Sequence, residues 1–127
     1  MPAGHTLGKR ERIKGRKAPA QLFDGSNSHS LTAFPLRVVF AANDRQGDQP
    51  LARIMVSVPK RLLKKAVDRN RVKRQVREAY RLAKDRLDVP QGKTIDMAFV
   101  WMDARLYDSA TVAARVRNLL KRIGGKI

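Results

Sequence analysis

The sequence of 127 residues contains no cysteine, and this absence excludes several kinds of chemistry. Without thiols the chain has no disulfides, no thiolate nucleophile and no cysteine-ligated zinc ribbon. It also lacks any run of about 18 apolar residues, so no segment is predicted to span a bilayer. The N-terminus, MPAGHTLGKRERIKGRK, is basic but lacks the apolar core of a secretory signal. A cytoplasmic location is therefore expected by default.

Imidazoles and clustered carboxylates are also scarce. The two histidines, His5 and His29, lie in Gly- and Ser-rich segments with no orienting carboxylate at motif spacing. We expect both to be exposed and without a catalytic role. The 11 acidic residues are scattered singly, with no D-x-D or E-x-x-H pattern that could hold a catalytic metal. The sequence therefore predicts no catalytic residues and no metal site of its own.

Positive charge is the feature present in excess. The chain has 28 Lys and Arg against 11 Asp and Glu, a net charge of +17. Hydrophobic residues make up 43% of it, so it is not a disordered polycation, and its length fits one domain. A folded domain with this imbalance repels itself unless a polyanion neutralises it. Nucleic acid is therefore the first-choice partner, and an anionic membrane surface is a weaker one.

The order of predicted elements indicates an α+β fold. We expect a flexible N-terminus over residues 1–8 and a single RNA-binding domain over residues 9–127. The domain should be a two-layer sandwich in which helices pack on one face of a small, mainly antiparallel sheet. The predicted elements are a short helix at about 17–24, strands at 36–42 and 52–58, a helix at about 60–87, a strand at 95–101, and a final helix that Asp108 or Ser109 caps and Gly124 and Gly125 end.

Two details of this expectation concern pairing and helix ends. The strands at 36–42 and 52–58 are interpreted as an antiparallel pair, because the segment between them, NDRQGDQP, is dense in turn formers. The long helix is expected to break near Asp68, where Asp68 or Asn70 could act as an N-cap. Backbone N–H groups near Arg69 and Arg71 would then point outward, in an arrangement that favours phosphate.

The segment AVDRNRVKRQVREAYR, residues 66–81, forms an amphipathic helix on a 100° wheel. Val72, Val76, Ala79 and Ala83 share one face, with Tyr80 at its edge, and that face should pack on the sheet. Solvated helix faces usually mix charges, but from Lys60 to Arg86 there are twelve basic and three acidic residues. Neutralisation by a phosphate backbone would offset the repulsion. The cations beside the apolar face are Lys73, Arg74, Arg77, Arg81 and Lys84.

The same segment resembles the signature of the bacterial ribonuclease P protein component, written loosely as A-V-x-R-N-x-x-K-R-x-x-R-E/Q. The strand RIMVSVPKR precedes the signature at the family's distance, and the resemblance covers most of residues 10–101. It implies the α+β sandwich described above, with a left-handed βαβ crossover, which is rare. The residues in register are Ala66, Val67, Arg69, Asn70, Lys73, Arg74, Arg77 and Glu78.

The resemblance also implies a role. In this family a catalytic RNA removes the 5′ leader of precursor tRNA with Mg²⁺ that the RNA binds, and the protein, a monomer with one copy per RNA, assists. Leader bases would lie in a cleft between the N-terminal helix and the sheet, lined by Phe23, Phe40 and Arg37. Phe23 and Phe40 are also ordinary candidates for the core. The residues that would contact the catalytic RNA are Arg69, Asn70, Arg71, Lys73, Arg74, Arg77, Lys60, Arg61 and Lys65.

The chain departs from the family pattern at several positions. Pro19 stands where many members carry a cleft aromatic, Lys64 replaces a glycine, and Pro59 replaces a serine. No cation follows the third strand until Arg105, although the family tends to place one at the cleft edge. These differences leave the RNA-binding signature intact and put leader affinity in doubt.

Other functions fit the sequence less well. A ribosomal or general RNA-binding protein would share the charge but not the ordered Arg-Asn-Arg signature. A helix-turn-helix DNA regulator would need polar base-reading residues and a dimer interface, whereas this helix offers cations almost exclusively. Trp101 and Tyr107 are expected in the core or at its rim rather than as base-stacking residues.

Overall fold

The computed structural model describes residues 28–44, 47 and 51–126. The predictions for residues 1–8, for a helix at 17–24, and for His5, Pro19 and Phe23 lie outside these ranges. Seven elements follow one another in the described chain. They are β1 (Ser28–Ala33), β2 (Leu36–Asp44), β3 (Ala52–Ser57), α2 (Ala66–Ala83), the 3₁₀ helix η3 (Lys84–Arg86), β4 (Lys93–Trp101) and α3 (Ser109–Gly124).

The four strands form one mixed sheet in the order β1-β2-β4-β3. β1 pairs antiparallel with β2, β2 pairs antiparallel with β4, and β3 pairs parallel with β4. The predicted antiparallel pairing of the second and third strands is therefore wrong, because β4 lies between them. A parallel pair cannot be closed by a hairpin, so α2 carries the chain from β3 to β4. The handedness of this crossover stays a prediction.

The first strand was not predicted. Its sequence, SHSLTA, is polar and carries one large apolar residue, Leu31, which is buried. Pairing with β2 holds it in place, and a two-residue turn at Phe34 and Pro35 joins the two strands. β2 is mainly apolar and buried, and its backbone pairs with this polar edge strand.

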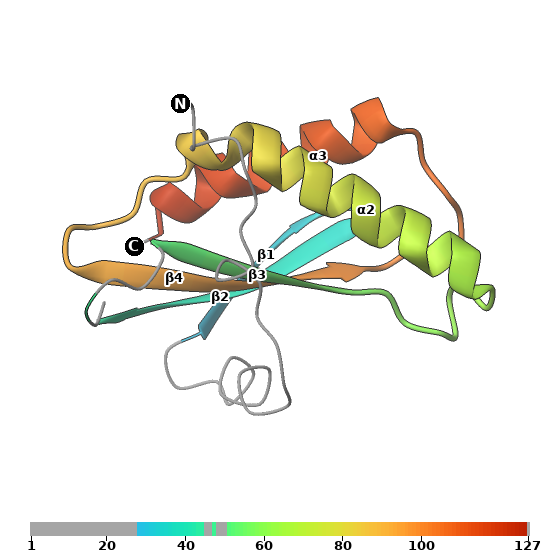
Figure 1. Ribbon diagram of the computed structural model, residues 1–127, viewed down its shortest axis with the longest axis horizontal. Coiled ribbons are helices and arrows are strands. Elements are labelled where there is room, and N and C mark those ends of the chain that lie inside the picture. Colours follow the sequence, from blue (N-terminus) through green and yellow to red (C-terminus); the bar gives the residue numbers. More distant parts are fainter. Residues whose placement is uncertain (1–27, 45–46, 48–50, 127) are drawn as a thin grey trace.

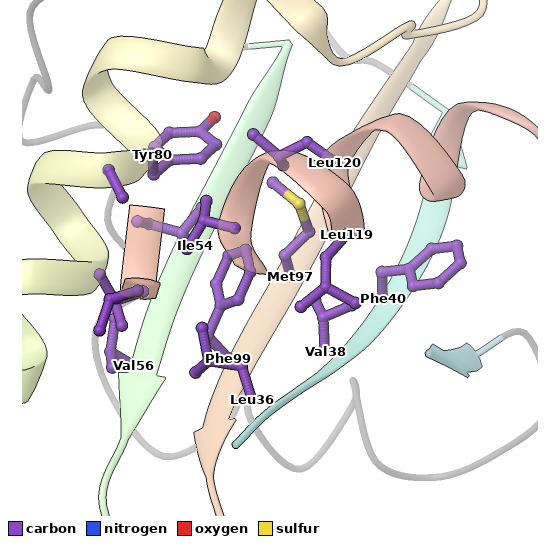
Figure 2. Close-up of a cluster of buried hydrophobic side chains, with 14 of the residues drawn as sticks. Leu36, Val38, Phe40, Ile54, Val56, Tyr80, Met97, Phe99, Leu119 and Leu120 are labelled. Atoms are coloured by element: carbon purple, nitrogen blue, oxygen red, sulfur yellow. The ribbon is translucent and has the colours of Figure 1, made fainter. Parts of the chain in front are cut away.

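Both long helices pack on the same face of the sheet, as Figure 1 shows. This arrangement confirms the predicted two-layer α+β sandwich. The buried residues of α2 are Val72, Gln75, Val76, Ala79, Tyr80 and Ala83, which confirms the predicted apolar face. Trp101, at the end of β4, is also fully buried, as expected of a core residue. Figure 2 shows how side chains from β2, β3, β4 and both helices meet in the core between the layers.

Phe40 belongs to this core. Its side chain is fully buried, and it lies with Leu36 and Val38 on the face of β2 that the helices cover. Alternate residues of a strand point to opposite faces, so Val39 and Ala41 face the other way. The expectation that Phe40 lines a leader cleft is wrong, because its ring is not available for base stacking.

The ends of the helices differ in how they are capped. Asp108 caps α3 as predicted, and its side chain accepts a hydrogen bond from the backbone N–H of Thr111 at 3.1 Å. Hydrogen bonding with the side chain of Thr111, and then with its backbone N–H, lowers the pKa of Asp108 below its ordinary value. The N-cap of α2 is Lys65, with no side-chain cap, so the proposal of Asp68 or Asn70 as the N-cap is wrong. Both lie inside the helix, whose first turn begins four residues before Asn70.

We predict that Phe40→Ala lowers the free energy of unfolding by about 3–5 kcal/mol, because it leaves a cavity between the sheet and the helices. Leu82→Ala, at an apolar side chain of α2 that is 55% exposed, should change it by no more than about 0.5 kcal/mol. Denaturant unfolding of both variants measures the difference. Equal, small effects would contradict the placement of Phe40 in the core.

Candidate nucleic-acid interface

A cationic surface covers the turn before α2 and the first half of that helix. Between Lys60 and Arg77 the chain has nine basic residues and one acidic residue, Asp68. We call this region the basic helix surface and define it by residues 60–77. Among the residues predicted to contact RNA, Lys73, Arg69 and Arg77 are partly buried, and those that are exposed are Lys60, Arg61, Lys65, Asn70, Arg71 and Arg74.

The turn at residues 59–65 is fixed by backbone hydrogen bonds and by one apolar anchor. The carbonyl of Pro59 accepts hydrogen bonds from the N–H groups of Leu62 and Leu63, at 3.0 and 3.3 Å. Leu63 is only 5% exposed and belongs to the core. With Leu63 held inside, the lysines that surround it along the chain are turned toward solvent. The turn therefore adds cations to the amino-terminal end of α2.

Arg69 has a structural function that the sequence did not reveal. Its Nη1 donates to the backbone carbonyl of Leu63 at 2.9 Å and to that of Lys64 at 2.8 Å. The guanidinium therefore ties the turn to the first turn of α2. We expected Arg69 only as an RNA contact, because a hydrogen bond to a carbonyl five or six residues earlier leaves no pattern in a sequence.

The acidic residue nearest the carboxyl-terminal edge of this surface is already paired. Glu78 accepts from Arg81 Nε at 3.1 Å, one turn further along α2. This hydrogen bond lowers the pKa of Glu78 below its ordinary value, so the carboxylate is ionised at neutral pH. The charges of Glu78 and Arg81 compensate each other. Glu78 therefore does not neutralise the cations of residues 60–77.

Gln75 fixes the position of α2 against the loop after β4. Its side chain is buried, and its Nε2 donates to the carbonyl of Tyr107 at 3.0 Å and to Ser109 Oγ at 3.1 Å. Tyr107 in turn packs edge-on against the ring of Trp101, with the ring centroids 5.5 Å apart. A buried amide held by two acceptors sets the rotation of α2, and with it the direction of the opposite, cationic face.

The sheet face that lies away from the helices forms a second region of interest. A surface pocket of about 420 Å³ lies on it, lined by residues of all four strands. Arg37 is exposed there, and its Nη2 donates to Ser30 Oγ at 3.4 Å. His29 is exposed, as expected, although it also contributes to this pocket. The pocket is lined by Ser28, His29, Ser30, Arg37, Val39, Ser57 and Val100.

The other end of this sheet face holds a neutralised ion pair. Arg53 and Asp96 face each other across the parallel β3–β4 pair and form two hydrogen bonds of 2.8 Å. The carboxylate raises the pKa of Arg53 above its ordinary value. Because the two charges compensate each other, Arg37 supplies the net positive charge among the described residues of this face. The sequence did not suggest the pair, since its members lie 43 positions apart.

Two further properties bear on function. Within residues 28–44, 47 and 51–126, no three His, Asp or Glu side chains are grouped as a metal ion would require. The helices of the described chain are too short or too polar to cross a membrane.

The fold and these surfaces define a small, basic α+β protein with the charge distribution typical of nucleic-acid-binding domains. Residues 7–124 match the ribonuclease P protein family. A ribonuclease P protein component from Porphyromonas gingivalis is 39% identical over 132 aligned positions, which cover 99% of this chain and 92% of the relative. The chain therefore belongs to the family of ribonuclease P protein components.

A more distant relative and solved structures of ribonuclease P proteins are also similar to this chain. The ribonuclease P protein component of Chlorobaculum tepidum is 36% identical over 64% of this chain and 53% of the relative. The ribonuclease P protein from Thermotoga maritima superimposes with a TM-score of 0.68 and 28% identity, over 89% of this chain and 97% of that one. A Staphylococcus aureus ribonuclease P protein mutant, at 21% identity and a TM-score of 0.58, shares the fold.

The two arginines that flank Asn70 should differ in their effect on stability. Arg69→Ala removes the hydrogen bonds to the turn and should lower the free energy of unfolding by about 1 kcal/mol. Arg71→Ala removes an exposed cation and should change it by less than about 0.5 kcal/mol. Denaturant unfolding of the two variants tests this difference, and equal stability of both would contradict the structural function of Arg69.

Proposed function

We propose that this chain is the protein subunit of ribonuclease P and that it binds the catalytic RNA through the basic helix surface. The observation that carries the proposal is the charge of residues 60–77, which contain nine basic residues and one acidic residue. These residues lie within the part of the chain that matches the ribonuclease P protein family. Charge of one sign on a packed helix costs stability unless a polyanion neutralises it. The RNA backbone would supply that neutralisation.

The geometry supports contacts to the phosphate backbone rather than to base edges. Arginine guanidinium groups match phosphate oxygens in pairs, and lysines add point charges. Asn70 is exposed between Arg69 and Arg71, so its amide can donate to the same backbone. Arg71, Arg74 and the cations of the turn would supply most of the binding energy, while Arg69 shapes the surface. Such contacts position an RNA without reading its sequence.

We further propose that the 5′ leader of precursor tRNA lies on the sheet face that the helices do not cover. Arg37 supplies the positive charge there, and the pocket beside it also contains hydroxyl groups of three serines, which can bind phosphate or sugar. Val39, on the same face of β2 as Arg37, also lines this pocket, although most of its side chain is buried. The stacking function of Phe23 stays a prediction.

In this proposal the protein contributes binding and the RNA contributes the chemistry. The holoenzyme would remove the leader endonucleolytically and so mature the 5′ end of tRNA. Mg²⁺ would be held through the RNA, and no step is assigned to a metal bound by the described residues, which do not provide a suitable group of ligands. One protein monomer per RNA and a cytoplasmic location belong to the same proposal.

The direct test is to add the purified protein to the ribonuclease P RNA of the same organism and to measure precursor-tRNA cleavage at low Mg²⁺. We expect cleavage by the mixture and none by the protein alone. If the protein binds many structured RNAs equally and never stimulates cleavage, it is a general RNA-binding protein. RNA-free cleavage that one acidic substitution abolishes would also reject the proposal.

Salt dependence tests the basic helix surface. The variant Arg71→Ala/Arg74→Ala should bind ribonuclease P RNA more weakly. The slope of log K against log salt should also become shallower by about 0.7–0.9 for each phosphate that the variant no longer neutralises. Binding isotherms at several salt concentrations measure it. Arg105→Ala is the control, because Arg105 is exposed in the loop after β4 and pairs with Asp103. An unchanged slope in the double variant would show that this surface is only solvated.

The leader proposal predicts a change in selectivity. In the holoenzyme, Arg37→Ala should weaken binding of precursor tRNA and leave binding of mature tRNA unchanged, because only the precursor carries a leader. The ratio of the two affinities is the measurement. Arg53→Ala/Asp96→Ala, which removes a neutral pair from the same face, is the control for general damage to the sheet. An equal loss of affinity for both RNAs would place Arg37 outside a leader site.

A further inference from the structure

A second group of cations lies at the other end of the helix layer. A surface pocket of about 480 Å³ is lined by Arg86 from η3 and by Ala114, Arg117, Asn118 and Lys121 from α3. The last residue of the basic helix surface, Arg77, precedes Arg86 by nine positions, and Arg71 and Arg74 lie further back along α2. In Figure 1 this end, near the carboxyl termini of both helices, lies at the left, and the amino-terminal end of α2 lies at the right.

The composition of α3 explains why the pocket is cationic. The helix runs from Ser109 to Gly124 with four basic residues and no acidic one. Two of the four fasten the helix to the sheet layer. Arg115 Nε donates to the carbonyl of Phe34 at 2.9 Å, and Arg122 Nη1 donates to that of Thr32 at 2.8 Å. The other two, Arg117 and Lys121, are exposed and line the pocket.

Asn118 completes a set of hydrogen-bond donors. Its Oδ1 accepts from Arg122 Nη1 at 3.2 Å, so the acceptor side of the amide is already occupied. The amide NH₂ group remains as a donor beside Arg117 and Lys121. Asp85 and Asp88 flank Arg86 along the chain, but neither lines the pocket. Two guanidinium groups, one ammonium group and one amide suit phosphate oxygens.

We infer that this pocket is a second phosphate-binding site, which holds the backbone of the catalytic RNA independently of the basic helix surface. The inference rests on the proposed function. The catalytic RNA is favoured over precursor tRNA, because the pocket belongs to the helix layer, whereas the proposed leader site lies on the opposite face of the sheet. An RNA that follows the outer surface of the helices would reach both cationic groups. The second group should add phosphate contacts rather than sequence readout.

The test is the variant Arg117→Gln/Lys121→Gln. For ribonuclease P RNA the slope of log K against log salt should become shallower by about 1.4–1.8, the value expected when two phosphates are no longer neutralised. Single variants at Lys121 and Lys126 give a matched control. Both lysines are exposed and lose one charge as Gln, but only Lys121 lines the pocket. Lys121→Gln should shift the slope by about 0.7–0.9 and Lys126→Gln should leave it unchanged.

Two further measurements separate this inference from its alternatives. Combination with Arg71→Ala/Arg74→Ala should give additive losses, because Arg71 and Arg74 lie in the first half of α2 and neither lines the pocket on α3. The wild-type protein is also tested for stimulation of precursor-tRNA cleavage. If wild type does not stimulate cleavage, the proposed function fails, whatever the binding slopes of the variants. With active wild type, an unchanged slope in the double variant would overturn the second site. Loss of binding only to precursor tRNA, or only to phosphatidylserine vesicles, would also overturn it.

Discussion

The burial of one face of α2 is the constraint on which the rest of this structure depends. Val72, Val76 and Tyr80 are almost completely removed from solvent between the sheet and α3. Burial of such side chains contributes about 1.5–3 kcal/mol each, which far exceeds the repulsion between exposed like charges on a helix. The helix therefore cannot rotate to spread its cations. They are held on the outer surface, where a polyanion can reach them.

The same constraint divides the molecule into two sides of different chemistry. The helix layer presents cations, in the basic helix surface and in the pocket on α3. The opposite face of the sheet has a small apolar centre of Val39, Ala41 and Ala98 between Arg37 at one end and a compensated Arg–Asp pair at the other. Under the proposed function, the catalytic RNA and the leader would therefore lie on opposite faces of the sheet.

Several side chains shape these surfaces through hydrogen bonds within the protein. Arg69 fixes the turn before α2, Gln75 fixes the helix against the loop after β4, and Arg115 and Arg122 fasten α3 to the β1–β2 region. Arginine can hold the fold together and add to the positive field at the same time. Its N–H groups donate to backbone carbonyls, and the charge of the guanidinium group is retained. The count of basic residues in this chain therefore includes several whose guanidinium groups hold backbone carbonyls.

The sequence alone determined the apolar and cationic faces of α2 and the cap of α3, because each depends on neighbours within a few residues. It also determined the fold class, from the order of the elements, and the family, from its signature. Only the tertiary structure decided the strand order, since β4 enters between β2 and β3 through pairing of residues 43 to 65 positions apart. It also decided the side of Phe40, because the run Val38–Ala41 is apolar at every position and carries no alternation to read. The hydrogen bonds of Arg69 and the position of Arg86 beside α3 depend on where the chain folds back, which residue type cannot encode.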